Sequence, residues 1–390
     1  GATLTLLAPF ARLASAAAKP DSRLVLVILR GGLDGLAAVP PYAEPEYAKL
    51  RGPIAIGRPG SDGGVLDLDG TFGLHPALTH LHALYRSGEA LVVHAAATPY
   101  RDRSHFYAQN VLEAGSVDPS AANGGWLNRA LAALHEAGAA RDAHGAVALA
   151  DSVPLVLRGD VAVASWAPSQ LPVPDDDTLL RVRRLYEAAA PDLAQSLYDA
   201  LEIRAIAGDP SEQRMDGRAG LRVAPLASAA ARFLASPDGP RIAVLDAGGW
   251  DTHANQGGSS GPLAQRLRGL DLGLQTLQAE LGTHWRETTV LVVTEFGRAA
   301  AVNGTRGTDH GTAGCAFAVG GAVAGGRVLA DWPGLTARDL HDGRDLRPTT
   351  DLRALFKAVL HERFGVGEAA LARSVFPASD TVEPLAGVTA

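Results

Sequence analysis

A continuous apolar run near the start of this 390-residue sequence constrains the fold most. This strand-like run covers residues 23–29 and reads Leu-Val-Leu-Val-Ile-Leu after Arg23, without polar alternation, and it ends in Arg30-Gly31-Gly32. Such a run is typical of a strand that is buried on both faces of a parallel sheet. Parallel neighbours are joined by crossover segments, usually helices, so the run predicts a layered α/β fold.

The remaining sequence alternates strand and helix signals as such a fold requires. Together with the opening run, the alternation predicts a doubly wound, mostly parallel sheet flanked by helices, in a single α/β domain over residues 21–390. Residues 175–237 lack strand-like runs and are rich in Arg and Ala, which predicts a helical insertion or cap. Further strand-like runs cover 90–96, 146–149, 161–165, 241–246, 288–294 and 316–319, and helix-like segments cover 75–85, 126–135, 262–281 and 351–364.

Composition excludes several classes of protein. Apolar residues make up 47% and charged residues 20%, which excludes an intrinsically disordered chain. The net charge of −7 argues against a nucleic-acid partner. Cys315 is the single cysteine, so there is no disulfide framework, and its small apolar neighbours indicate a core position. No stretch of the body approaches 18 uncharged apolar residues, so we expect no transmembrane span.

Residues 1–20 indicate the remnant of an export signal. They are apolar and Ala-rich and end in a run of small residues, Ser15-Ala16-Ala17-Ala18. An amphipathic N-terminal helix is the alternative. The export interpretation predicts a periplasmic or secreted protein.

Two polar loops at the ends of predicted strands carry candidate metal ligands. Asp251 and His253 lie two positions apart, a spacing at which a carboxylate and an imidazole can reach one divalent ion. Glu295 follows a buried strand, where an unpaired carboxylate would be unfavourable, so it needs a metal or Arg298 as partner. We expect Asp251, His253 and His310 to converge at one site. The alternatives are a helix cap by Asp251 and a structural Glu295–Arg298 pair.

Two further strand-end loops carry a candidate nucleophile and candidate anion-binding groups. Ser104, beside His105, is a candidate nucleophile, metal ligand or substrate-binding hydroxyl. Arg30 and Arg103 are cations suited to an oxyanion such as phosphate or sulfate. Asp34 adds a hard anion at the end of the first strand. The alternatives are a solvated loop and a strand-to-helix turn with a surface ion pair.

Seven short motifs resemble the DUF1501 family in their order, over residues 23 to 365. This family commonly carries a twin-arginine export signal, and it is grouped with the alkaline phosphatase and sulfatase superfamily. The motifs are Leu29-Arg30-Gly31-Gly32-Leu33-Asp34-Gly35, Ser104-His105-Phe106, Gly125-Trp126-Leu127, Gly249-Trp250-Asp251-Thr252-His253, Thr294-Glu295-Phe296-Gly297-Arg298, Asp309-His310-Gly311 and Leu346-Arg347-Pro348-Thr349-Thr350-Asp351.

The resemblance implies an alkaline-phosphatase-like fold with divalent metals beside a nucleophile. Asp251 and His253 resemble the Asp and His of one metal site, and His310 resembles its distant histidine. Glu295 falls where the superfamily has an Asp after a buried strand. Ser104 falls near the nucleophile.

The first strand departs from this pattern. A metal-binding Asp is usual directly after it, whereas Arg30-Gly31-Gly32 stands here and Asp34 comes later. Glu295 is followed by Phe296 rather than by His. One ion, zinc as first choice, is therefore expected, with a second ion as the alternative. The candidate ligands are Asp251, His253, His310, Glu295 and Asp34.

These features predict an exported, metal-dependent hydrolase of phosphate or sulfate esters. The attacking group is Ser104 or metal-bound water. Arg30, Arg103 and Arg298 are expected to neutralise the oxyanion. The substrate is a small-molecule or oligomeric anionic ester. Two alternatives stay open, a non-catalytic metal or ligand-binding protein on the same fold and a metal-dependent redox protein.

Overall fold

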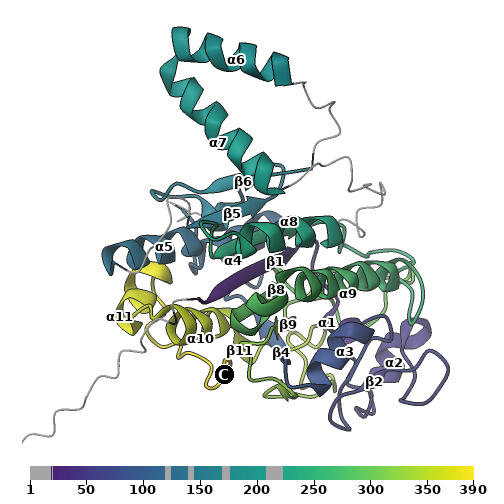
Figure 1. Ribbon diagram of the computed structural model, residues 1–390. Helices are drawn as coiled ribbons and strands as arrows, with labels where there is room; N and C mark the ends of the chain where they lie inside the picture. The colour runs from purple at the N-terminus through teal and green to yellow at the C-terminus, as the bar shows by residue number, and fades with distance from the viewer. Residues whose placement is uncertain (1–18, 20, 119–123, 139–144, 169–175, 208–222) are drawn as a thin grey trace, which may run out of the picture.

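The computed structural model describes Lys19 and residues 21–118, 124–138, 145–168, 176–207 and 223–390 (Figure 1). The predicted export signal lies outside the described residues except for Lys19. The strands are β1 (Arg23–Leu29), β2 (Leu66–Asp67), β3 (Gly73–Leu74), β4 (Ala90–Ala97), β5 (Ala146–Leu149), β6 (Ala164–Trp166), β7 (Ile242–Ala247), β8 (Thr288–Val293), β9 (Gly314–Val319), β10 (Arg327–Leu329) and β11 (Thr350–Asp351). The helices are α1 (Gly35–Ala38), α2 (Tyr47–Arg51), α3 (Thr79–Arg86), α4 (His105–Ala114), α5 (Trp126–Glu136), α6 (Asp176–Ala189), α7 (Pro191–Ala207), α8 (Val223–Ala235), α9 (Pro262–Leu281), α10 (Leu352–Phe364) and α11 (Glu368–Ala370).

The central sheet confirms the predicted α/β fold. Its strand order is β10-β4-β9-β8-β1-β7-β5-β6, with β11 paired to β4. All pairings in this sheet are parallel except those of β9, which runs antiparallel to β4 and β8. The sheet is therefore mixed but mostly parallel, as the alternation of strand and helix signals predicts.

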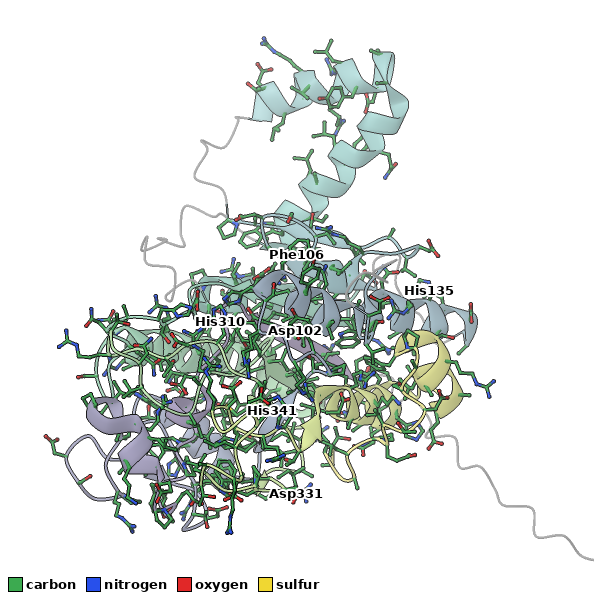
Figure 2. All side chains as sticks on the ribbon, turned by 180° about the vertical axis from the view of Figure 1, so that it is seen from behind. Asp102, Phe106, His135, His310, Asp331 and His341 are labelled. Carbon is green, nitrogen blue, oxygen red and sulfur yellow. The ribbon has the colours of Figure 1, made fainter. Side chains whose placement is uncertain are left out.

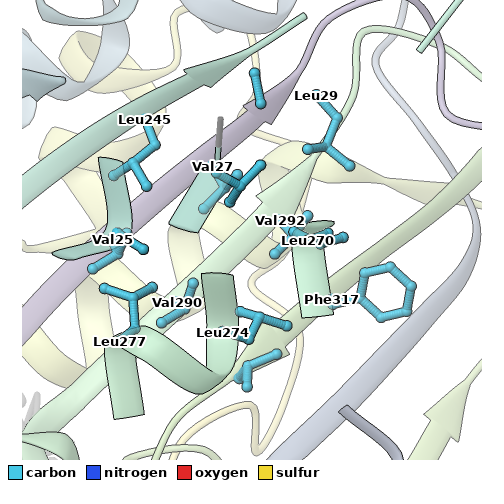
Figure 3. Packing of buried hydrophobic residues seen from close by; sticks show 14 of the residues in the cluster. Val25, Val27, Leu29, Leu245, Leu270, Leu274, Leu277, Val290, Val292 and Phe317 are labelled. Carbon is cyan, nitrogen blue, oxygen red and sulfur yellow. The ribbon is translucent and has the colours of Figure 1, made fainter. Parts of the chain in front are cut away.

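Strand β1 is apolar and buried from Leu24 to Leu29 because helices cover both faces of the sheet. Val25, Val27 and Leu29 pack in the same core cluster as the buried face of α9. The alternate residues of β1 pack in a second cluster with α5 and α10. Figure 3 shows the first cluster, in which Leu270, Leu274 and other α9 side chains contact residues of four strands. The amphipathic segment at 262–281 is thus a helix over the predicted range.

The described part of residues 175–237 is helical. Helices α6 and α7 form a hairpin that projects from the body of the protein (Figure 1). Helix α8, in contrast, is buried along most of its length and packs against α9 and β7. The stretch therefore combines a projecting hairpin with one helix of the layer that covers the sheet.

The topology brings three loops to one place. Strands β8, β1 and β7 are parallel neighbours in the middle of the sheet, so their carboxyl ends meet at one edge. The loops that leave these ends carry Glu295, Gly31 and Asp251. Ligand sites of open α/β sheets form at such an edge.

His94 is a fully buried histidine of β4 that packs against Phe72 and Trp332. Its Nδ1 accepts a hydrogen bond from the Ala95 N–H (2.8 Å), so Nε2 carries the proton and donates to the Val39 carbonyl (2.9 Å). Both ring nitrogens are satisfied only in the neutral ring. Burial lowers the pKa of His94 to about 4.

We expect acid to destabilise the protein through His94. The folded-state pKa of about 4 lies below the ordinary 6.5, so the unfolded chain binds the proton first. This contribution, on the order of 3 kcal/mol, is present above pH 6.5 and is lost as the pH falls toward 4. His94→Gln should flatten the fall in urea-unfolding free energy over this range, with a residual slope from His75. His135→Gln, at an exposed histidine, should leave the slope unchanged, and equal slopes in both variants would contradict the assignment.

Candidate metal centre

Three histidines converge on Asp251. His253 Nε2 lies 2.9 Å from His310 Nε2 and 3.0 Å from Asp251 Oδ1, and His310 Nε2 lies 3.2 Å from the same oxygen. His105 Nε2 lies 3.5 Å from Asp251 Oδ2. The structure thus brings together the predicted Asp251, His253 and His310, although the two histidines are 57 positions apart. His310 lies in the body of the protein, away from the projecting hairpin (Figure 2).

All three imidazole rings are oriented in the same sense. In each ring Nδ1 faces a hydrogen-bond acceptor, so the proton belongs on Nδ1 and Nε2 keeps its lone pair. The bare Nε2 atoms are the ones that converge on Asp251. The acceptors are Glu295 Oε1 for His105 (2.8 Å), the Arg103 carbonyl for His310 (3.0 Å) and Asp309 Oδ1 for His253 (3.4 Å).

The donor set fits a zinc-like ion. Ligands that lie 2.0–2.1 Å from a tetrahedral ion are about 3.3 Å from one another, which is the scale of the separations given above. His105 Nε2 is buried and has no hydrogen-bond partner among the described residues. His105, Asp251 and His310 offer donor atoms within 4.8 Å of one another, and they form the one such group in the described part of the chain. These donors suffice for one ion.

Asp251 is held as an anion by Arg298. The Arg298 guanidinium is fully buried and donates to Asp251 Oδ1 at 2.5 Å and to the carbonyls of Gly31 and Thr308. Burial acts to raise the pKa of Asp251, but the hydrogen bond and charge of Arg298 outweigh it, so the pKa is lowered. Burial, followed by the charges of His105 and Arg298, lowers the pKa of His310. Both side chains are thereby kept in the protonation states that bind a cation.

Gly31 allows the end of β1 to pass against the Asp251 loop. It has φ +123°, and a Cβ there would lie 2.4 Å from the Asp251 nitrogen. We expect Gly31→Ala to lower the free energy of unfolding by about 3 kcal/mol, since backbone strain adds to a steric clash, and to weaken zinc binding. Gly60 is the matched control. It also has positive φ, but nothing lies within 4 Å of its added Cβ, so Gly60→Ala should lose only about 1 kcal/mol in a denaturant titration. Equal losses would contradict this account.

Glu295 lies behind His105 rather than beside the Nε2 atoms that converge on Asp251. The side chain is fully buried, and Oε1 bonds His105 Nδ1 and the Gly31 N–H. Burial acts to raise the pKa of Glu295, but the His105 and backbone hydrogen bonds outweigh it and the pKa is lowered. The Glu295 hydrogen bond in turn raises the pKa of His105.

Asp34 is also placed outside the donor group. Its carboxylate is buried, pairs with Arg51, accepts from Gln256 Nε2 (2.6 Å) and caps α1 through the Ala37 N–H. These partners satisfy both oxygens. Asp34 therefore joins α1 to its surroundings, and the structure offers it no free position for a metal.

The arginines expected to bind an oxyanion are each paired with carboxylates. Arg30 bridges Glu113 (2.7 Å) and Asp246 (2.6 Å). Arg103 pairs with the buried Asp345 (2.6 Å) and with Asp342 (3.1 Å), and its backbone carbonyl orients His310. Arg298 pairs with Asp251, as described above. All three thus stabilise the loops around the site.

Ser104 occupies the N-cap position of α4, directly before His105. Its side chain is half-buried and makes no capping hydrogen bond, although serine at this position usually does. The described residues offer its hydroxyl no other hydrogen bond. Ser104 therefore presents a free hydroxyl beside a member of the donor group.

The sequence indicated His105 only as the neighbour of Ser104. The signal that would have placed it in the donor group is its position in a strand-end loop, like Asp251 and His310. The partner that selects its nitrogen, Glu295, is 190 positions away.

A profile of the family described as "Protein of unknown function (DUF1501)" matches residues 88–376 of the 390. The chain belongs to the DUF1501 family. No curated protein matches this DUF1501 chain.

Several solved structures are similar to the DUF1501 chain. One is a protein in the alkaline phosphatase superfamily from Vibrio parahaemolyticus, with 12% identity, 94% of this chain and 70% of that chain covered, and a TM-score of 0.41. Another is the phosphonate monoester hydrolase of Agrobacterium radiobacter, with 12% identity, 89% and 74% covered, and a TM-score of 0.37. A third is the lipoteichoic acid synthase LtaP from Listeria monocytogenes, with 10% identity, 93% and 76% covered, and a TM-score of 0.38. Similarity at this level transfers neither a substrate nor an activity to the DUF1501 chain.

Among the described residues of the DUF1501 protein, no helix is both long enough and apolar enough to cross a membrane.

Proposed function

We propose that this protein is an exported, metal-dependent hydrolase of phosphate or sulfate esters. The observation that carries the proposal is the convergence of three imidazole Nε2 atoms on Asp251, each with its Nδ1 facing an acceptor. Three imidazoles and one carboxylate are a ligand set typical of zinc. The sequence of residues 1–20 supports the proposal of export to the periplasm or beyond.

The residues of the site have distinct roles in this proposal. His105, Asp251 and His310 hold the ion, and His253 is a fourth donor at the exposed edge. His253 is 45% exposed, against 30% for His105 and 24% for His310. A divalent ion bound there supplies Lewis acidity, which polarises the ester and lowers the pKa of the attacking hydroxyl.

The start of α4 suits the anionic group of such an ester. The backbone N–H groups of residues 105–107 precede the first hydrogen bond of the helix, which joins the Ala108 nitrogen to the Ser104 carbonyl. Free N–H groups and the helix dipole favour an anion at this end. The start of α4 thus offers hydrogen-bond donors to an oxyanion. The three arginines do not, because each is already paired with a carboxylate.

A non-catalytic metal-binding protein is the second candidate. The pairing of Arg30, Arg103 and Arg298 with carboxylates favours it, because a free guanidinium would be expected to neutralise a transferring phosphoryl or sulfuryl group. Metal analysis of the purified protein, combined with a panel of phosphate, phosphonate and sulfate esters, separates the two. Bound metal with turnover that a chelator abolishes supports the hydrolase. Bound metal without turnover on any ester supports the binder, and no bound metal contradicts both.

We expect Ser104→Ala to fold normally and to lose ester turnover by at least about 100-fold if the hydroxyl attacks the ester. The change removes no hydrogen bond among the described residues, so the melting temperature and zinc affinity should stay near those of the wild type. Steady-state kinetics on the best ester of the panel measure the effect. An unchanged rate would eliminate Ser104 as the nucleophile and leave water as the attacking group.

A further inference from the structure

The carboxylate of Glu295 is fully buried at the end of β8, and four donors surround it. Oε1 accepts from His105 Nδ1 (2.8 Å), the Gly31 nitrogen (2.8 Å) and Gln109 Nε2 (3.2 Å). Oε2 lies 2.9 Å from Thr294 Oγ1, whose single proton is also within reach of the nearer Leu29 carbonyl (2.7 Å). Three of these donors bond Oε1, which has two lone pairs, so this oxygen is fully occupied. Glu295 therefore acts on the ion site through His105.

Building on the metal-dependent function proposed above, we propose that Glu295 is the positioning residue that makes His105 a metal ligand. By accepting the Nδ1 proton, Glu295 fixes the ring with Nε2 bare and directed toward Asp251. The position of the carboxylate is itself fixed by the backbone of Gly31, at the end of a neighbouring strand. A carboxylate bonded to the far nitrogen of an imidazole also makes the near nitrogen a stronger donor to a metal.

The pair His253–Asp309 provides an internal comparison. Its Nδ1 to Oδ1 distance is 3.4 Å, and the Asp309 side chain is 52% exposed, whereas Glu295 is fully buried. Asp309 also accepts a hydrogen bond from Asn303. Water around Asp309 screens its charge, so the two carboxylates should differ greatly in their effect on the ion.

Glu295→Gln and Asp309→Asn test this difference as a matched pair. In each variant the amide oxygen still accepts the Nδ1 proton, so only the negative charge is lost. At position 295 the new amide group also donates to Thr294 Oγ1, which favours a normal fold. We expect the zinc dissociation constant to rise roughly 10–100-fold in Glu295→Gln and less than about 3-fold in Asp309→Asn. An unchanged affinity in Glu295→Gln, with an unchanged melting temperature, would overturn the proposal, and so would equal losses in both variants.

A second measurement on the wild-type protein does not depend on metal binding. Nitrogen NMR of the metal-free protein at pH 9 identifies which ring nitrogen of His105 carries the proton, with the signal assigned from His105→Gln. We expect the proton on Nδ1, and a proton on Nε2 would overturn the positioning role. If the wild type binds no zinc, the proposed metal-dependent function fails, while this measurement still decides whether Glu295 orients the His105 ring. The same measurement on the wild type remains decisive even when Glu295→Gln fails to fold.

Discussion

Replacing His310 with alanine should abolish stoichiometric zinc binding and, with it, the turnover of any ester substrate. His310 is the least exposed of the three histidines and contacts both Asp251 and His253. Its loss removes a donor directly, so the effect should exceed the roughly 10–100-fold loss that follows removal of a ligand's hydrogen-bond partner. Zinc content after dialysis and the rate of ester hydrolysis measure the effect.

His341→Ala is the control for this prediction. His341 lies in a neighbouring loop and its Nε2 faces Asp342 at 3.5 Å, outside the donor group. Its replacement should leave zinc content unchanged. If His310→Ala keeps one zinc per chain with wild-type affinity, the proposed ligand set is wrong.

Replacing Arg298 with methionine should lower the free energy of unfolding by about 3–5 kcal/mol. The guanidinium is fully buried, and its loss leaves the carbonyls of Gly31 and Thr308 without their donor and Asp251 without its counter-ion. Arg298→Lys should restore only part of the stability, because one ammonium group cannot reach all of these acceptors as a planar guanidinium does. Denaturant titrations of the three proteins measure the effect.

Arg306 offers a matched control in the same loop region. Its side chain is exposed and bonds only Asn255 among the described residues. Arg306→Met should change the free energy of unfolding by less than about 0.5 kcal/mol. A loss in Arg298→Met no greater than this would mean that the Arg298 contacts do not hold the site together.

Much of the fold follows from local patterns. Strand β1 and helix α9 have the predicted bounds. A continuous apolar run indicates a strand that is buried on both faces, and an apolar period of 3.6 residues indicates a helix with one buried face. The predicted helix at 75–85 begins later, at Thr79, since His75 is tied to the Gly258 carbonyl and the Ala77 nitrogen before the helix starts.

The sequence predicted which residues gather at the candidate site better than it predicted what each of them does there. Asp251, His253 and His310 follow from residue type and from position at strand ends. Glu295 and Asp34 are also acidic residues near strand ends. The structure, however, surrounds both carboxylates with hydrogen-bond donors.

The sequence by itself determined the α/β layering and the edge of the sheet at which the polar loops gather. Only the tertiary structure decided which side chains at that edge face one another. Glu295 meets His105 across 190 positions, and Arg298 meets Asp251 across 47. Strand runs and helix periods are local in the sequence, so they can be read from it directly. A hydrogen bond or ion pair depends on differences of an ångström or two between loops that are distant in the chain, and packing of the whole sheet sets those distances.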